Sequence, residues 1–98
     1  MTAYLMSNYD VTNPEAFEAY PAAVGPTVFA HGGEILVADM ESESIEGQPR
    51  KVTVILKFPS KEAAHAWHSS EEYVKIMHLR TDNTEGVITL SDEFVMPD

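Results

Sequence analysis

The segment from residue 58 to residue 73 constrains the fold more than any other part of this chain. It closes an apolar run, and Ser60 then offers the hydroxyl that favours a helix N-cap. Trp67 falls on the apolar face of the helix that follows. Ser69 and Glu72 form a capping box, which predicts that a second helical segment restarts there. An apolar strand followed by a two-part amphipathic helix indicates an α+β fold, and we expect a pocket beside the helix.

Composition and charge exclude several classes of protein. The 98 residues suffice for one domain, residues 1–98, and a hydrophobic fraction of 44% is that of a globular chain. Six basic against sixteen acidic residues give a net charge of −10, which repels nucleic acid and anionic lipid. No cysteine is present for disulfides or thiolate chemistry. The chain has neither an apolar span of roughly 20 residues nor a signal peptide, so we expect a cytoplasmic protein without membrane or nucleic acid partners.

The first half of the chain predicts a strand and a divided helix. Alternation over residues 4–9 is typical of a strand, and Asn13 followed by proline is a favourable helix start. Apolar residues then recur at helical spacing: Phe17, Tyr20, Val24 and Val28. Because Pro21 and Pro26 each lack an N–H donor, we expect a kinked or two-piece helix that ends at the glycine pair 32–33.

Three further strands complete the pattern, at residues 34–40, 52–58 and 87–90, with a polar, acidic connection between the first two. The order strand, helix, strand, strand, helix, strand is the ferredoxin-like βαββαβ arrangement. It predicts a four-stranded antiparallel sheet that carries both helices on one face.

Two of these strands are apolar on both faces. The run from residue 52 to residue 56 is interrupted only by Thr53, and the strand at 34–40 alternates so that Ile35, Val37 and Asp39 lie opposite Leu36, Ala38 and Met40. The helices can cover only one face, and a second copy of the same sheet would cover the other. We therefore predict a symmetric homodimer whose sheets pack face to face.

A set of short motifs spread over nearly the whole chain resembles one family. They are an N-terminal strand with Tyr4, Asn13-Pro14-Glu15 through Tyr20, Gly32-Gly33, Glu46-Gly47, Phe58-Pro59-Ser60, Ala64, Trp67 and Glu72-Tyr73. The family is DUF1330, a domain of unknown function in the dimeric α/β-barrel superfamily. The resemblance implies a ferredoxin-like protomer, a dimer and a pocket between sheet and helices in each subunit, without an established reaction. Glu34 stands where these proteins often carry an arginine, so anion binding through that arginine is not implied here.

Arg80 is the most informative candidate for ligand binding. It continues the helical spacing of Tyr73, Ile76 and Met77 by one turn, so it should point toward the core side. Its forked donors suit a carboxylate or an enolate. Alternatively, it merely complements the negative end of the helix dipole.

The other candidates for ligand binding are Asn8, Tyr20, Trp67 and Tyr73. The tyrosine hydroxyls need partners when buried and could donate to a ligand carbonyl, whereas Trp67 could simply pack in the core. Asn8 shares a strand face with Tyr4 and Met6, so its amide must be hydrogen-bonded there. Either the backbone or a ligand could supply the partner.

Of the four histidines, His31 and His78 are the candidate acid–base residues. His31 ends the first helix, where a cation would also suit the helix dipole. His78 lies off the Tyr73 stripe and could be a solvent-edge residue. His65 and His68 are three apart, yet no third ligand is placed by spacing, so no metal site is predicted.

These features leave two classes of function open. One is an enzyme without metal or nucleotide cofactor, acting on a hydrophobic, oxygen-rich molecule. The superfamily resemblance extends this to monooxygenase- or isomerase-like chemistry. The other is a non-catalytic dimer that binds a metabolite or serves as an accessory subunit.

Haem degradation is a remote alternative. Asn8 and Trp67 resemble residues of the haem-degrading branch of the superfamily, but His78 falls one position late and is rotated by about 100° on an ideal helix. The sequence does not identify the substrate.

Overall fold

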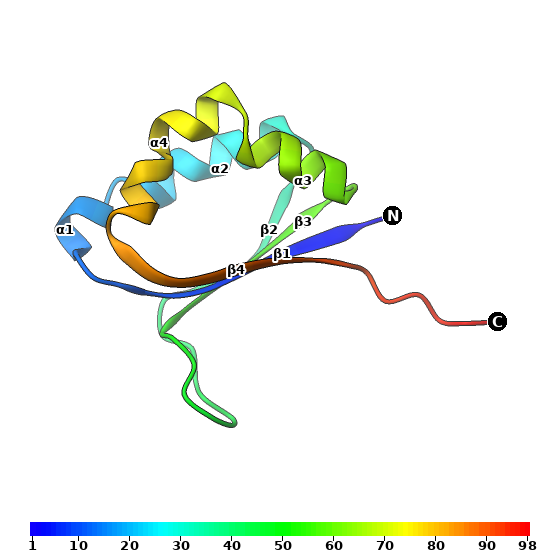
Figure 1. The fold of residues 1–98 in the computed structure, drawn as a ribbon, viewed down its shortest axis with the longest axis horizontal. Coiled ribbons are helices and arrows are strands. Elements are labelled where there is room, and N and C mark those ends of the chain that lie inside the picture. The colour runs from blue at the N-terminus through cyan, green and yellow to red at the C-terminus, as the bar shows by residue number, and fades with distance from the viewer.

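The computed structural model describes residues 1–98 and has the predicted ferredoxin-like architecture, with each crossover helix divided in two. Its elements in chain order are β1 (Ala3–Val11), α1 (Pro14–Phe17), α2 (Tyr20–Ala30), β2 (Glu34–Asp39), β3 (Val52–Phe58), α3 (Lys61–His68), α4 (Glu71–Thr81) and β4 (Thr84–Asp92). The strands form one antiparallel sheet in the order β2-β3-β1-β4. The helices cover one face of this sheet, and the loop between β2 and β3 projects from the other side (Figure 1). The predicted fold class is therefore confirmed.

The first crossover is the two-piece helix that the prolines predicted. The side chain of Asn13 caps α1 by accepting a hydrogen bond from Ala16 N at 3.4 Å. α2 begins anew at Tyr20, with Pro21 in its first turn, where a missing N–H donor costs nothing. Pro26, by contrast, is accommodated within α2 and does not interrupt it. Gly32 closes the helix with φ +76, a conformation that favours glycine.

The second crossover corrects the predicted cap. Ser70, rather than Ser69, begins α4: its Oγ accepts a hydrogen bond from Tyr73 N at 3.2 Å, and its backbone is extended. Ser69 instead ends α3, where its hydroxyl donates to the carbonyl of His65 at 2.9 Å. Ser69 therefore caps the end of α3 and Ser70 caps the start of α4. The predicted capping box between Ser69 and Glu72 does not form.

The register of the sheet places one row of side chains under the helices. Leu5, Ser7 and Tyr9 of β1 face them, together with their β3 partners, which are Leu56, Val54 and Val52. The predicted alternation of β2 is wrong at its start, because a β-bulge lies between Ile35 and Val37. The bulge lets Ile35 share the helix-facing side with Ala38, since an extra residue shifts the alternation by one.

The buried core joins this row to the helices through large rings. Its members are Leu5, Tyr9, Phe17, Tyr20, Val28, Val52, Leu56, Phe58, Ala64, Trp67 and Tyr73. Phe58 and Tyr73 are fully buried. Gly33 packs so closely beneath this core that a β-carbon would come within 2.8 Å of Phe58 and 2.6 Å of Val28. The core therefore packs α2 and α4 directly against the sheet.

The opposite face of the sheet is covered by no other element of the chain. On this face, Ile55 of β3 pairs with Val37 of β2 on one side and with Met6 of β1 on the other. The side chain of Met6 is 38% exposed. Val87 on β4 is 63% exposed on the same face. None of the helices is long and apolar enough to cross a membrane.

Candidate functional site

A cavity of about 110 Å³ lies between the helices and the sheet. It has 17 lining residues, of which 14 are hydrophobic. The groups that can form hydrogen bonds or carry charge are few: Ser7, Tyr9, Tyr20, Tyr73 and Arg80. An apolar cavity with a few convergent polar groups is the usual form of a small-molecule site.

Three of the predicted residues form one connected polar group in this cavity, which we call the phenol–guanidinium group: Tyr20, Tyr73 and Arg80. The two phenol oxygens are 2.8 Å apart, and Arg80 Nε donates to the Tyr73 hydroxyl at 3.1 Å. The hydroxyls carry two protons, and their mutual hydrogen bond uses one of them. Whichever tyrosine donates, one O–H remains for a ligand.

Arg80 lacks the carboxylate partner that most other cations of the chain have. Arg50, Lys57, Lys61 and Lys75 each lie within ion-pair distance of an acid. No ion pair forms at Arg80, although the chain has sixteen acidic residues and the side chain is partly buried. A buried or half-buried charge is normally paired. The guanidinium therefore carries uncompensated positive charge toward the cavity.

The protonation states of this group follow from its surroundings. Burial is the largest influence and disfavours the charged form of Arg80, but the hydrogen bonds and electrostatic interactions with Tyr73 and Tyr20 together outweigh it, so the pKa of Arg80 lies above its ordinary value. Burial, followed by the neighbouring Tyr73, raises the pKa of Tyr20 far above its ordinary value. Burial also raises the pKa of Tyr9, although Arg80 opposes this. The site thus offers neutral phenol donors beside a permanent cation.

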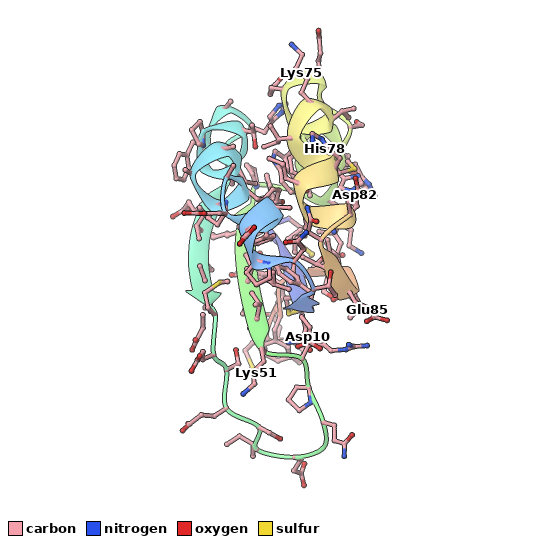
Figure 2. The ribbon with its side chains drawn as sticks, turned by 90° about the vertical axis from the view of Figure 1, so that its left-hand side faces the viewer. Asp10, Lys51, Lys75, His78, Asp82 and Glu85 are labelled. Atoms are coloured by element: carbon pink, nitrogen blue, oxygen red, sulfur yellow. The ribbon has the colours of Figure 1, made fainter.

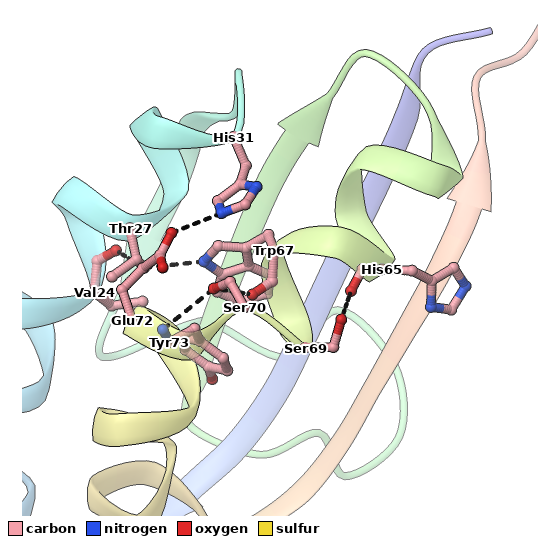
Figure 3. Close-up of polar contacts among 9 residues, drawn as sticks. All are labelled: Val24, Thr27, His31, His65, Trp67, Ser69, Ser70, Glu72 and Tyr73. Atoms are coloured by element: carbon pink, nitrogen blue, oxygen red, sulfur yellow. Dashed lines mark hydrogen bonds and ion pairs between the residues drawn. The ribbon is translucent and has the colours of Figure 1, made fainter.

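Trp67 contributes its ring to the cavity wall but not its N–H. The indole Nε1 donates to Thr27 Oγ1 at 3.0 Å, and the Thr27 hydroxyl donates in turn to the Val24 carbonyl at 2.6 Å (Figure 3). The ring packs against Tyr73 with a centroid distance of 4.2 Å. Trp67 thereby fixes the position of Tyr73 and ties α3 to α2.

Asn8 lies apart from the cavity, on the opposite face of the sheet. Its Nδ2 donates to the carbonyls of Arg50 and Val52 at 3.1 and 3.0 Å, and its Oδ1 accepts from Arg50 N at 2.8 Å. Of the two partners left open by the sequence, the backbone is the one observed. The amide anchors the start of β3, and the structure does not bring it together with the phenol–guanidinium group.

Neither histidine proposed as an acid or base lines the cavity. His31 Nε2 lies 2.9 Å from Glu72 Oε1 on the outside of the helix layer, where it links α2 to α4 (Figure 3). A hydrogen bond from its own backbone, followed by His31, lowers the pKa of Glu72. His78 is exposed on α4 between Lys75 and Asp82 (Figure 2).

Two polar residues of the cavity were missed by sequence reasoning, Ser7 and Tyr9. Both lie on the helix-facing side of β1 and are buried, with exposed fractions of 6% and 4%. Ser7 is the detectable signal, because a hydroxyl interrupts an apolar row between Leu5 and Tyr9. Asn8, the polar residue of this strand that was predicted to bind a ligand, belongs to the other face.

The residues present do not suit haem, nor do they gather around a metal. No three side chains of His, Asp or Glu come together as a ligand set. No histidine lines the cavity, and its volume corresponds to one aromatic ring rather than to a porphyrin. Asn8 lies on the far face of the sheet and His78 is exposed on α4, so neither shares the cavity wall with Trp67.

Comparison with known protein families finds one match, a domain of unknown function (DUF1330), over residues 2–94. The match therefore spans nearly the whole chain. No match was found among curated protein sequences.

Several solved structures share the fold at low sequence identity. A protein of unknown function from Rhodopseudomonas palustris has a TM-score of 0.75 at 14% identity, over 97% of this chain and 84% of its own. SnoaB, a cofactor-independent oxygenase from Streptomyces nogalater, has a TM-score of 0.67 at 11% identity, over 99% and 98%. An antibiotic biosynthesis monooxygenase has a TM-score of 0.58 at 15% identity, over 97% and 100%. At these identities the likeness establishes the fold alone.

Proposed function

The chain belongs to the DUF1330 family of domains of unknown function, and from the residues of its cavity we propose that it binds a compact molecule with an acidic hydroxyl as an oxyanion against Arg80. A phenol or a cyclic enol is the class that we have in mind. The unpaired guanidinium of Arg80 is the observation that carries this proposal.

The size and lining of the cavity limit the rest of the ligand. An apolar cavity of about 150 Å³ binds benzene, so a cavity of about 110 Å³ limits the enclosed part of a ligand to about one small ring. The wall is hydrophobic on all sides except at the phenol–guanidinium group, Ser7 and the hydroxyl of Tyr9. A one-ring molecule with one oxygen directed at Arg80 and the free phenol O–H satisfies both features.

Such binding prepares the ligand for chemistry that needs no metal. Arg80 and the phenol donors stabilise negative charge on the ligand oxygen in a site that excludes much of the water. An enolate or phenolate is electron-rich at carbon, where it can take up a proton in an isomerisation or react with dioxygen. The shared fold with a cofactor-independent oxygenase supports the second route.

One observation favours a non-catalytic, metabolite-binding or accessory role instead. The titratable residues that line the cavity are three tyrosines and one arginine, and burial holds two of those tyrosines neutral. No carboxylate or histidine lies in the cavity wall to accept a proton from the ligand. If nothing nearby supplies that acceptor, the cavity binds and does not catalyse.

We further propose that the protein acts as a homodimer joined through the bare face of the sheet. The apolar row of Val37, Ile55 and Met6 on this face has no cover from the chain itself. A second copy of the sheet would cover it and leave each cavity open on its own helix side.

The first experiment compares 4-nitrophenol with 4-nitroanisole, a neutral analogue of nearly the same shape that cannot ionise. We expect the wild-type protein to bind the phenol more tightly. Arg80→Ala should remove roughly tenfold or more of that preference, since a charge-assisted hydrogen bond contributes about 1.5–3 kcal/mol. Isothermal titration of both ligands provides the affinities.

Arg50→Ala is the matched control, because Arg50 is the only other arginine and pairs with Asp10 at 2.9 Å on the surface. It should keep the wild-type preference. Equal affinity of the wild-type protein for the two ligands, or an unchanged preference in Arg80→Ala, would reject the proposed function.

A further inference from the structure

We propose that His68 accepts the proton that a phenol or enol loses when its oxygen pairs with Arg80. This inference rests on the proposed function and adds the proton acceptor that the cavity wall itself lacks. It changes the predicted acid–base residue from His31 or His78 to the histidine that ends α3.

His68 is the histidine whose ring packs beside the phenol–guanidinium group. Its ring centroid lies 5.8 Å from that of Tyr73 and 6.1 Å from that of Trp67. Arg80 Nε contacts the same Tyr73 through its hydroxyl. His68 and Arg80 therefore both pack against Tyr73, and His68 forms no ion pair or hydrogen bond that would occupy its nitrogens.

A second hollow brings His68 next to the cavity. This hollow, of about 230 Å³, lies between α3 and β4, and two of its lining residues, Leu5 and Ile88, also line the cavity. A third hollow, of about 170 Å³, contains Arg80 and again shares Ile88. Ile88 therefore borders the cavity and both hollows, of which one contains His68 and the other contains Arg80.

The groups around His68 keep its ring neutral and ready to accept a proton. From α4 it faces Arg80 and Tyr73, and from its own helix His65. The residues of β1 and β4 that line the same hollow carry no charge: Leu5, Ile88, Thr89 and Leu90. Burial, then Arg80 and His65, lower the pKa of His68 below its ordinary value.

The proton transfer is balanced within the complex. The O–H bond of the ligand breaks and its electron pair stays on the ligand oxygen. Because His68 lines the neighbouring hollow rather than the cavity, the proton reaches it through solvent, and a new N–H bond forms on the imidazole. The oxyanion then lies between two cations, Arg80 and the imidazolium. Since the negative charge offsets the repulsion from Arg80, the pKa of His68 rises when the ligand is bound.

The test measures proton release when 4-nitrophenol binds, at a pH below its own pKa where the free molecule is neutral. Titration calorimetry in two buffers of different ionisation enthalpy gives the number of protons released. The wild-type protein should release almost none, because His68 keeps the proton. His68→Gln should release about one proton per bound phenolate or bind it several-fold more weakly.

His78→Gln is the control, because it also removes an imidazole, and His78 is exposed on α4 outside the hollow that contains His68. It should retain the wild-type proton balance, and thermal melts should show that both variants fold. Release of about one proton by the wild-type protein and His68→Gln alike would overturn the role of His68 while leaving the proposed function standing. Absence of phenolate binding in the wild-type protein would reject both.

Discussion

At the scale of single residues, helical spacing identified the polar group of the cavity, whereas strand alternation could not tell which face of β1 the helices cover. Arg80 continues the stripe of Tyr73 along one helix, so its direction could be predicted from the sequence. Asn8 was also correctly placed on its strand face, but which face the helices cover depends on the fold. The importance of His68 depends on how α3 packs against α4 and β4, which no local pattern encodes.

The changed interpretation of Asn8 makes a direct prediction. Asn8→Ala removes the amide that anchors the backbone at Arg50 and Val52. The free energy of unfolding should fall by about 1–2 kcal/mol, because several hydrogen bonds are lost at a half-buried site. The affinity for 4-nitrophenol should stay within twofold of wild type. Chemical denaturation and ligand titration measure the two effects, and a loss of affinity without a loss of stability would return Asn8 to the ligand site.

At the scale of helices and strands, periodicity predicted every element and erred where neighbouring residues compete. Both Ser69 and Ser70 can cap a helix, and only the packing of α3 against α4 decides which one begins α4. The bulge between Ile35 and Val37 likewise depends on the pairing of β2 with β3 rather than on either strand alone. Such choices belong to tertiary structure, so a single sequence does not reveal them.

The cap of α4 is worth testing because this helix carries Tyr73 and Arg80. Ser70 Oγ accepts from Tyr73 N and donates to the Trp67 carbonyl at 2.7 Å. Ser70→Ala should lower the free energy of unfolding by about 1 kcal/mol, the usual contribution of an N-cap. Ser69→Ala, the neighbouring control, should cost less in thermal or urea denaturation. A larger loss for Ser69→Ala would contradict the observed cap.

At the scale of the whole molecule, the two faces of the sheet have different roles. The helices enclose one face and its cavity, as Figure 1 shows, while the other face presents apolar side chains from three strands. The sequence predicted this two-sided character from the run at residues 52–56, although the side chains that form the bare row follow from the register and the bulge. A dimer through this face remains our prediction.

The predicted dimer depends on the apolar row of the bare sheet face, so a charged substitution in that row tests it. Ile55→Lys places a cation in the centre of the bare face, beside Met6 and Val37. We expect sedimentation velocity to show a dimer for the wild-type protein and a folded monomer for this variant. Val74→Lys, on an exposed position of α4, should remain dimeric. A monomeric wild-type protein at micromolar concentration would disprove the dimer.

The central claim is that Arg80 holds a ligand oxygen as an anion in the cavity. The visible absorption spectrum of bound 4-nitrophenol tests it most directly, because only the ionised form absorbs strongly in the visible. At a pH where the free molecule is neutral, our account predicts a phenolate spectrum with the wild-type protein and its loss in Arg80→Ala. A bound molecule that remains neutral in the wild-type protein, or a phenolate spectrum that survives in Arg80→Ala, would contradict the account.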